Sequence, residues 1–294
     1  TMQKIVPHLW YDTGAADAAT LYTSLFPGSS ILSRSTMPDT PSGNVDILRI
    51  NLAGFELMMM SAGPYFQFNP SVSFLVACDT AAEVDRLHAG LSAGNDLMPL
   101  GEYPFSGRYA WVADRFGLSW QIMLTDRIPH AQRITPTLMF TGAQAGKAEE
   151  AMRMYTGLLP RSSLGAVMRW EAGEGPDKAG TVKHGSFTLG GTGFAAMDSA
   201  YEHGFSFNEA VSLMVYCDGQ AELDRYWDAL SAQTEAEQCG WLKDRYGLSW
   251  QIVPTAMDDM MAKGSPEAIG RVTQAFLAMK KFDIATLERA YQGI

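Results

Sequence analysis

The side chains best suited to chemistry in this sequence are a few histidines, carboxylates and amides in or beside apolar segments. His8 lies in "IVPHLWYD", where its imidazole can ligate a metal or hydrogen-bond to a neighbour. Asp198 and His203 lie in "FAAMDSAYEHGFSF", where they can act as acid and base, orient a ligand or hydrogen-bond within a turn. Gln121 and Gln251 occupy equivalent positions in "DRFGLSWQIM" and "DRYGLSWQIV". These residue types indicate a site for a small molecule or a metal ion.

The pattern around the two glutamines is one of several blocks that occur twice in the same order. "IVPHLWYD" matches "ITPTLMFT", "LFPGSSI" matches "LLPRSSL", and "FNPSVSFLVACD" matches "FNEAVSLMVYCD". Blocks repeated in order indicate an internal duplication. We therefore predict two homologous domains over residues 1–128 and 134–254, followed by a C-terminal helical tail over residues 255–294.

Each copy alternates short apolar runs with amphipathic helical patterns, which is typical of a mixed α/β fold. In copy 1, a β-branched and aromatic run over 5–11 precedes a helical pattern over 15–25. Three apolar stretches follow, near Ile31, over 45–52 and over 55–60. This order predicts one βαβββ unit in the first half of the copy.

A second unit of the same kind begins at "SVSFLVACD". Thr80 precedes Glu83 by three residues, which is the spacing of a capping box at a helix start. Strands are expected over 109–112 and 118–124. Copy 1 is longer in "NDLMPLGEYPFSGRY" and copy 2 is longer around "WEAGEGPDKAG", so we expect loops at both places. The chain then contains four βαβββ-like units.

Composition limits the class of protein. With 294 residues, of which 47% are hydrophobic and 18% charged, the chain is typical of a soluble globular protein. It has neither a long apolar run nor a signal peptide pattern, so we expect a cytoplasmic protein away from membranes. A net charge of −10 argues against nucleic acid as a partner. Its cysteines, Cys78, Cys217 and Cys239, favour reduced buried thiols rather than disulfides or a zinc site.

The repeated segments resemble a known family. The paired units, "LWYD" with a helix ending in "LYTSLFP", "HGFSFNEAVSLMVYCD", "CGWLKDRYGLSWQIVP" and the tail are similar to the PhnB-like branch of the vicinal oxygen chelate superfamily, often labelled 3-demethylubiquinone-9 3-methyltransferase. The resemblance implies an α+β fold of tandem glyoxalase-like domains, each of two βαβββ units forming a curved sheet cup, plus C-terminal helices. It also implies a monomer acting as a pseudo-dimer, or a homodimer.

The resemblance allows a test for a metal site. Metal-dependent relatives place His on the first strand of a unit and Glu on the last, because these ligands suit Zn, Ni, Fe or Mn. Here Gln121 and Gln251 stand at the closing-strand positions, and Thr137 in copy 2 aligns with His8 in copy 1. We therefore expect no complete metal site. If a divalent metal binds, the candidate ligands are His8, Glu56 and Gln121.

The remaining pocket candidates follow from the alternation of side chains along a strand. His8 and Trp10 share one face of the first strand, and Met58 and Met60 share one face of a later strand. The methionines either line a cup for apolar ligands or fill the core. The repeated glutamines either face the cup and bind a polar ligand group, or tie neighbouring strands together.

Three functions are compatible with these features. The first is a superfamily member that binds a small molecule in its cup, with its reaction undefined. The second is a metal-dependent lyase, isomerase or dioxygenase of glyoxalase type. The third is the methyltransferase of the family label, but "LGGTGF" at Leu189 is typical of a hairpin turn and not of a nucleotide-binding loop. Whether the protein is an enzyme stays open.

Overall fold

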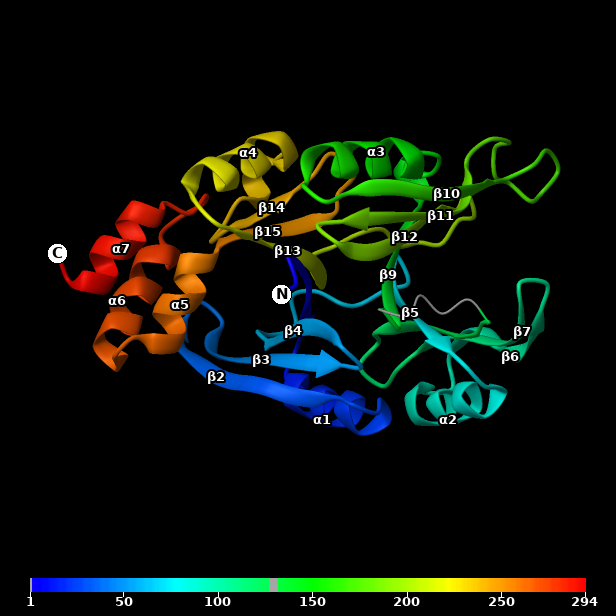
Figure 1. Ribbon diagram of the computed structural model, residues 1–294, viewed down its shortest axis with the longest axis horizontal. Coiled ribbons are helices and arrows are strands. Elements are labelled where there is room, and N and C mark those ends of the chain that lie inside the picture. Colours follow the sequence, from blue (N-terminus) through cyan, green and yellow to red (C-terminus); the bar gives the residue numbers. More distant parts are fainter. Residues whose placement is uncertain (1, 127–131) are drawn as a thin grey trace. The chain divides into compact units, whose positions relative to one another are not determined.

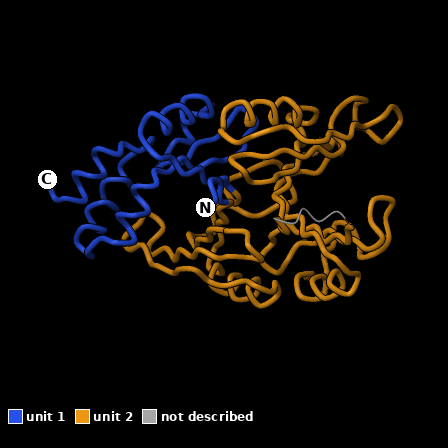
Figure 2. The backbone as a smooth tube through the Cα atoms, in the orientation of Figure 1, with its two compact units in different colours: residues 1–6, 212–294 blue, residues 7–211 orange. Residues whose placement is uncertain are grey.

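The computed structural model describes residues 2–126 and 132–294. The predicted end of copy 1, at residue 128, lies outside the described residues. The chain divides into two compact units, of which unit 1 comprises Thr1–Val6 and Ser212–Ile294 and unit 2 comprises Pro7–Val211 (Figure 2). Unit 2 therefore contains most of copy 1 together with the first half of copy 2.

The first βαβββ unit has the predicted elements. These are β1 (Ile5–Tyr11), α1 (Ala15–Leu25), β2 (Ser30–Thr40), β3 (Gly43–Leu52) and β4 (Phe55–Ser61). Within unit 2, β1 pairs in parallel with β4, and β3 pairs antiparallel with both β4 and β2. One face of α1 is buried through small and aromatic side chains, as its helical pattern predicts.

A continuous eight-stranded sheet forms the larger part of unit 2 (Figure 1). Copy 1 contributes β5 (Val72–Cys78), α2 (Ala81–Leu91), β6 (Asp96–Tyr103), β7 (Ser106–Ala113) and β8 (Ser119–Leu124). Copy 2 contributes β9 (Ile134–Phe140), η1 (Gly142–Gln144), α3 (Ala148–Leu158), β10 (Ser163–Arg169), β11 (Val182–Leu189) and β12 (Thr192–Asp198). The strand order is β10-β11-β12-β9-β5-β8-β7-β6.

The two copies meet in this sheet where β5 pairs antiparallel with β9. Two reciprocal side-chain contacts reinforce the junction: the Asn69 amide donates to the carbonyl of Ser206, and the Asn208 amide donates to the carbonyl of Gln67, both at 2.9 Å. The second unit of copy 1 and the first unit of copy 2 therefore build one sheet.

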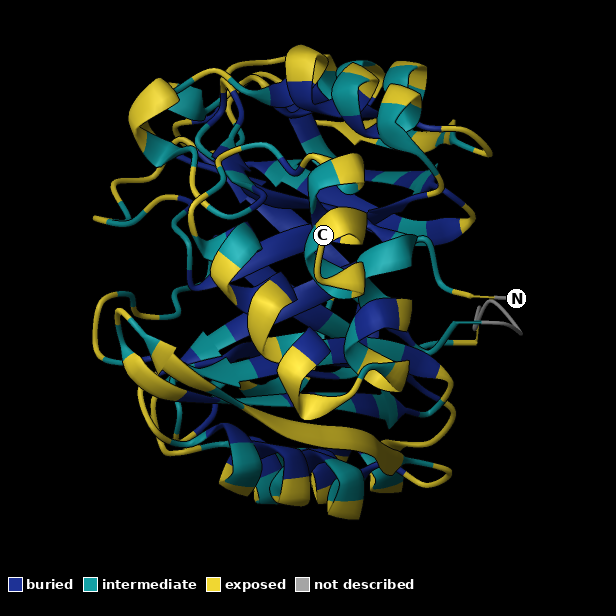
Figure 3. Cartoon of the chain, turned by 90° about the vertical axis from the view of Figure 1, so that its left-hand side faces the viewer, coloured by how far each residue is buried: buried dark blue, intermediate teal, exposed yellow. Residues whose placement is uncertain are grey.

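Helices α2 and α3 lie on one face of this sheet (Figure 1). The start of α2 is capped as predicted, because the Thr80 hydroxyl accepts from the Glu83 N–H at 3.1 Å. Exposed positions concentrate on the outward sides of the helices and on strands β2 and β10, whereas most other strands are largely buried (Figure 3). We call the sheet face away from α2 and α3 the inner face.

The two loops predicted from the length differences between the copies have different outcomes. The extra residues of copy 1 form strand β6 and the beginning of β7 instead of a loop, because they pair across a hairpin. The extra residues of copy 2 form the irregular connection between β10 and β11, as expected. The "LGGTGF" segment is the tight turn between β11 and β12, with Leu189 opposite Thr192, which confirms the hairpin.

Unit 1 contains the second half of copy 2 and the C-terminal tail. Its elements are β13 (Val211–Cys217), α4 (Gln220–Leu230), η2 (Thr234–Ala236), β14 (Trp241–Lys243), β15 (Ser249–Pro254), α5 (Thr255–Lys263), α6 (Pro266–Leu277) and α7 (Ile284–Gln292). The predicted C-terminal helices are thus confirmed. Among the described residues, no helix has both the length and the apolar character needed to span a membrane.

The tail also provides backbone partners in unit 1. The N–H groups of Cys239 and Gly240 donate to the carbonyls of Met279 and Lys280 at 2.8 and 2.7 Å. Copy 1 has the β6 strand beside the corresponding residues of β7. The tail therefore provides hydrogen-bond partners for backbone groups of copy 2 whose equivalents in copy 1 pair with β6.

Candidate ligand-binding site

The repeated ten-residue pattern builds a rigid support for the sheet. The Asp114 carboxylate accepts hydrogen bonds from the Phe116 and Leu118 N–H groups at 2.9 and 3.0 Å, and from the Trp120 indole at 3.0 Å. Gly117 adopts a φ of +88°, which the intervening turn requires. The pattern thus fixes the indole of Trp120 in place.

The orientation of Trp120 decides where Gln121 points. Trp120 is fully buried and packs against the rings of Tyr22, Phe26 and Phe74 on the helix-covered side. Consecutive side chains on a strand point to opposite faces. Gln121 therefore lies on the inner face of the sheet.

Both ends of the Gln121 amide have protein partners. The Tyr109 hydroxyl donates to Gln121 Oε1 at 2.5 Å, and Gln121 Nε2 donates to Ser73 Oγ at 2.8 Å. The side chain therefore links β8 to β7 and to β5. Thr137 of copy 2 lies directly opposite Ser73 in the β5–β9 register, so this polar chain ends where the two copies meet.

An apolar cluster covers the inner face around this polar chain. Its buried members are Tyr109, Trp111 and Met139. Partly buried side chains pack against them: Met98, Tyr103, Met123, Met197 and Phe205. We call these eight residues the inner cluster. None of these eight residues is among the site residues predicted above, although the alternation in "GRYAWVA" and "ITPTLMF" is a signal for one shared face in each strand.

Two series of aromatic contacts lead from exposed positions to the inner cluster. In copy 1, the ring of Phe105 contacts Tyr109 edge-on with centroids 4.8 Å apart. In copy 2, the ring of Tyr201 contacts His203 at 6.3 Å, and His203 contacts Phe205 at 4.9 Å. Phe105 and Tyr201 are each 57% exposed. The two copies therefore each place an exposed aromatic ring next to the cluster.

His203 is a candidate acid–base group at this site. Its Nε2 shares a hydrogen bond of 2.6 Å with the Ser199 hydroxyl. Burial lowers the pKa of His203, while the nearby Asp177 carboxylate raises it. The net lowering favours a neutral imidazole at pH 7, which can accept a proton.

Asp198, the other acidic candidate in this segment, points to the opposite side. Its carboxylate accepts hydrogen bonds from the backbone N–H groups of Gly146, Ala148 and Val182 at 2.8, 3.0 and 2.9 Å. These contacts hold the start of α3 next to β11. Asp198 therefore stabilises the backbone of its neighbours, because both of its carboxylate oxygens accept hydrogen bonds from backbone N–H groups.

The copy 1 candidates on β1 and β4 form a separate group. His8 lies opposite Met58 and Trp10 lies opposite Met60, so these four side chains share one face. Met59 is on the other face and fully buried. Burial lowers the pKa of His8 to about 4, so its imidazole is neutral at pH 7.

The three metal-ligand candidates do not form a suitable donor set. His8 and Glu56 belong to one sheet, whereas Gln121 belongs to the eight-stranded sheet. The Glu56 carboxylate pairs with the Arg49 guanidinium at 3.0 Å. Across residues 2–126 and 132–294, no cluster of three or more His, Cys, Asp or Glu side chains is arranged to hold a metal ion. The residues present do not fit the His and Glu donor set that the sequence resemblance implies.

Gln251 occupies the equivalent position in unit 1, with a shorter polar chain. Gln251 Nε2 donates to Ser212 Oγ at 3.0 Å, as Gln121 does to Ser73. Cys239, however, stands at the position equivalent to Tyr109. The two copies therefore differ at the residue that extends the polar chain on the inner face.

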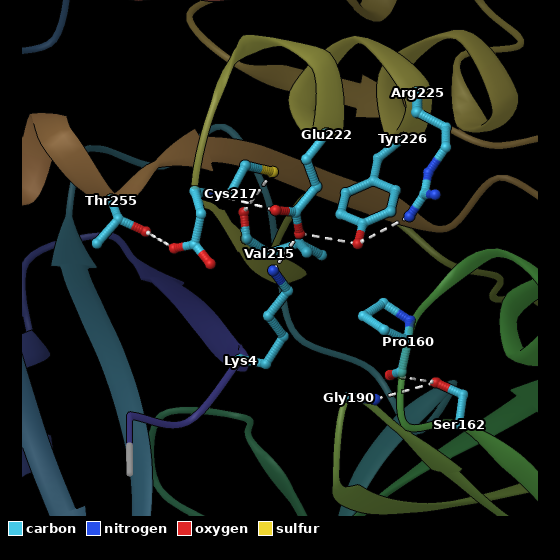
Figure 4. A network of polar contacts seen from close by, with 11 residues as sticks. Lys4, Pro160, Ser162, Gly190, Val215, Cys217, Glu222, Arg225, Tyr226 and Thr255 are labelled. Atoms are coloured by element: carbon cyan, nitrogen blue, oxygen red, sulfur yellow. Dashed lines mark hydrogen bonds and ion pairs between the residues drawn. The ribbon is translucent and has the colours of Figure 1, made fainter.

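The cysteines are not placed for nucleophilic chemistry. Figure 4 shows Cys217 beside Glu222, which forms an ion pair with Lys4 and accepts from the Tyr226 hydroxyl at 2.8 Å. Burial, with Glu222 adding to it, raises the pKa of Cys217 to about 12, and burial likewise raises that of Cys78 to about 12. Both thiols are free and buried, as predicted, whereas Cys239 is free but only half-buried, so the prediction of burial is wrong for Cys239. The two buried thiols remain protonated near neutral pH.

The strand order and the repeated βα units define a tandem glyoxalase-like fold. The family model described as 3-demethylubiquinone-9 3-methyltransferase matches residues 3–123 and 132–253, and the chain belongs to this family. The match occurs once in each sequence copy, which confirms both the resemblance and the duplication.

Two solved structures are similar to this chain. A putative 3-demethylubiquinone-9 3-methyltransferase, PhnB protein, from Bacillus cereus is 36% identical, with 42% of this chain and 100% of that chain covered and a TM-score of 0.39. Glyoxalase I from Zea mays is 12% identical over 88% of this chain and 97% of that chain, with a TM-score of 0.54. The second likeness confirms the predicted tandem α+β fold. Among proteins with curated descriptions, none matches.

Proposed function

We propose that the protein binds a small molecule on the inner face of the eight-stranded sheet, without a standard catalytic metal. The observation that carries this proposal is the Gln121 amide. It stands where metal-dependent relatives are expected to carry a carboxylate, and it is committed to Tyr109 and Ser73. A neutral amide with both ends occupied is a poor metal ligand.

The inner cluster supplies the binding surface for such a ligand. Tyr109, Trp111 and Met139 are buried on the inner face beneath partly buried methionine and aromatic side chains, and thioether and aromatic side chains adapt to varied apolar shapes. His203 adds a neutral imidazole at the edge of this cluster. A lyase or isomerase reaction would use this group for proton transfer.

The methyltransferase named in the family description is a weaker candidate. The glycines of "LGGTGF" form the β11–β12 turn, and a strand follows them instead of a helix. A nucleotide-binding loop of the common kind needs a helix N-terminus after the glycines. Saturable, stoichiometric binding of S-adenosylmethionine would reverse this ranking.

We further propose that the chain acts in the cytoplasm as a monomer in which the duplicated domains, residues 1–128 and 134–254, replace the subunits of a dimer. The β5–β9 junction supports this, because it pairs strands of the two copies within one chain. The tail over residues 255–294 then belongs to unit 1. Light scattering tests the proposal, and a stable homodimer would contradict it.

The decisive experiment measures metal in untagged protein by elemental mass spectrometry, before and after chelation and loading with Zn, Ni, Co, Mn or Fe. We expect no near-stoichiometric metal in the wild type. Gln121→Glu is the matched variant, because it places a carboxylate at this position in a side chain of the same shape as glutamine. Stoichiometric metal in the wild type that is lost in His8→Ala or Gln121→Ala would overturn the proposal and favour the metal-dependent alternative.

A further inference from the structure

We propose that unit 1 contains a second binding site, which takes a small guanidinium compound at the carboxyl ends of the parallel strands β13 and β15. The structure shows a cavity of about 410 Å³ there, lined by the end of β13 and by the first turns of α4, α5 and α7. Cavities that hold small molecules have volumes of roughly 300–1,000 Å³. All of the lining residues belong to unit 1 and none to the inner cluster, so the inference goes beyond the function proposed above.

Carboxylates are the only charged side chains that line this cavity in the described part of the chain. Asp218 follows β13, and the tail adds Asp283 and Glu288. Two basic side chains of the tail have partners of their own: Lys281 pairs with two carboxylates of α4 at 3.1 and 3.8 Å, and Arg289 donates to a threonine hydroxyl of α7 at 3.0 Å. The lining therefore favours a ligand with positive charge.

Copy 1 has a guanidinium at the equivalent place. Arg133, which precedes β9, contacts the Asp79 carboxylate at 2.7 Å and the Glu83 carboxylate at 3.8 Å. Asp79 directly follows β5, and Glu83 lies in the first turn of α2. The planar fork of an arginine side chain presents several donors at once and so suits a pair of carboxylates. Copy 1 therefore shows which kind of cation this arrangement accepts.

Copy 2 retains both carboxylates but has a lysine in place of the arginine. By the alignment of the repeated blocks, Lys4, Asp218 and Glu222 stand at the three equivalent positions. The Lys4 ammonium pairs with Glu222 and not with Asp218 (Figure 4). Asp218 accepts a hydrogen bond from the Thr255 hydroxyl at 3.3 Å, and no described basic side chain forms an ion pair with it. A carboxylate that has a guanidinium partner in copy 1 therefore lines the cavity of copy 2 without one.

Helices α4 and α7 begin at the cavity, and helix N-termini by themselves attract anions. Here the protein's own carboxylates lie at both ends: Asp283 accepts from the Thr286 N–H at 2.8 Å at the start of α7, and Glu222 accepts from the Asp218 N–H at 3.1 Å before α4. Hydrogen bonds from Thr286 lower the pKa of Asp283, and the charge of Arg289 lowers it further. Asp283 is therefore ionised at pH 7, and the helix ends do not make the cavity an anion site.

Three probes of similar length test the site by isothermal titration calorimetry at pH 7: butylguanidine, pentylamine and butylurea. They present, in this order, a planar cation with several donors, a compact cation, and a neutral group shaped like the guanidinium. We expect one-to-one binding of butylguanidine. Pentylamine should bind severalfold more weakly, because an ammonium lacks the fork that pairs with a carboxylate through two hydrogen bonds. Butylurea should bind at least about tenfold more weakly, because its hydrogen bonds are not charge-assisted.

Asp218→Asn and Asp79→Asn form a matched pair of variants. Asp218→Asn should lower the affinity for butylguanidine about three- to fivefold, the effect of losing one exposed ion pair. Asp79→Asn removes the same charge at the equivalent position of copy 1, where Arg133 already supplies the guanidinium. It should leave the affinity unchanged. Because Asp218 is exposed, its substitution should leave the fold intact.

Lys4→Arg tests the comparison of the copies without removing a carboxylate. The forked side chain should pair with both Asp218 and Glu222, as Arg133 does with its two carboxylates. It should then occupy part of the site and weaken the binding of butylguanidine at least as much as Asp218→Asn does. An unchanged affinity in both Lys4→Arg and Asp218→Asn would exclude Asp218 as the partner of the ligand and overturn the proposal.

The remaining outcomes distinguish a specific site from general charge. Equal losses of affinity in Asp79→Asn and Asp218→Asn would mean that butylguanidine responds to the negative charge of the whole protein, which would overturn the site. Equal affinities for butylguanidine and pentylamine, or for butylguanidine and butylurea, would overturn the guanidinium class. Absence of any binding by butylguanidine would overturn both. None of these results alters the function proposed for the inner face, which rests on residues of unit 2.

Discussion

The carboxylate of Asp114 accepts a hydrogen bond from the Trp120 indole at 3.0 Å, and Asp244 makes the same contact with Trp250 at 3.0 Å. In both copies the same carboxylate also accepts backbone N–H groups two and four residues later. The repeated pattern is therefore conserved between the copies as a structural clamp, in which aspartate closes a turn and tryptophan anchors the closing strand. The glutamine that follows is turned toward the inner face.

Asp114→Asn should destabilise the protein by roughly 2–3 kcal/mol, because an amide nitrogen replaces one acceptor oxygen among buried donors. Tyr22 also donates to this carboxylate, at 2.5 Å. Urea unfolding measures the change. Asp17→Asn on the exposed side of α1 is the control and should shift stability by less than about 0.5 kcal/mol. An Asp114→Asn variant with an unchanged free energy of unfolding would show that the clamp does not stabilise the fold.

His8 should make stability depend on pH. Its pKa is about 4 in the folded protein against 6.5 as the ordinary value, because burial disfavours the charged imidazole. The unfolded chain therefore binds a proton that the folded chain does not, so stability is lost as pH falls from about 6.5 to about 4. The loss from this group is roughly 3 kcal/mol at most.

A His8→Gln variant isolates this contribution. The difference in unfolding free energy between wild type and His8→Gln should favour the wild type more at pH 7 than at pH 4. Urea titrations at several pH values measure it. A difference that stays constant with pH would mean that His8 titrates alike in the folded and unfolded chain.

The three cysteines should react with iodoacetamide in a defined order. Burial raises the pKa of Cys78 and Cys217 from 9.0 to about 12, which lowers their thiolate fraction roughly a thousandfold. Cys239 is less buried. Peptide mass spectrometry should find Cys239 alkylated first in native protein and the other two only after unfolding. Labelling of Cys78 as fast as that of Cys239 in native protein would contradict the burial of Cys78.

Gly240→Ala should loosen the C-terminal tail. Gly240 has a φ of +83°, and an added Cβ would lie 2.4 Å from the Phe282 ring. Gly247→Ala is the matched control, since its φ is +84° and an added Cβ meets nothing within 4 Å. Backbone strain should cost both variants about 1–2 kcal/mol. Only Gly240→Ala should become more sensitive to limited proteolysis within the tail, and equal sensitivity would exclude the contact with Phe282.

Local sequence features predicted the elements well. The helical pattern over 15–25 became α1, and the apolar runs near Ile31, over 45–52 and over 55–60 became β2, β3 and β4. The extra segment of copy 1 was harder, because its Gly and Pro residues are typical of loops, yet pairing with β7 makes it strand β6. The partner strand, which local composition does not report, decided the outcome.

Which side chains lie together in the candidate site was decided by tertiary contacts more than by local sequence. Alternation predicted that Gln121 opposes Trp120, and the rings around Trp120 determine that Gln121 lies on the inner face. Nothing in the linear order links Tyr109 with Gln121 and Ser73, or brings Phe205 of copy 2 into the cluster that contains Trp111 of copy 1. These contacts join strands from separate parts of the chain.

By itself, the sequence determined the duplication, the family, the succession of strands and helices and the neutral amide at the closing strand, because each depends on residue types within a short window. The tertiary structure alone decided that the second unit of copy 1 pairs with the first unit of copy 2, and therefore which side chains share the inner face. Strand partners are chosen by the total burial and hydrogen bonding of the assembled sheet, which no local periodicity encodes.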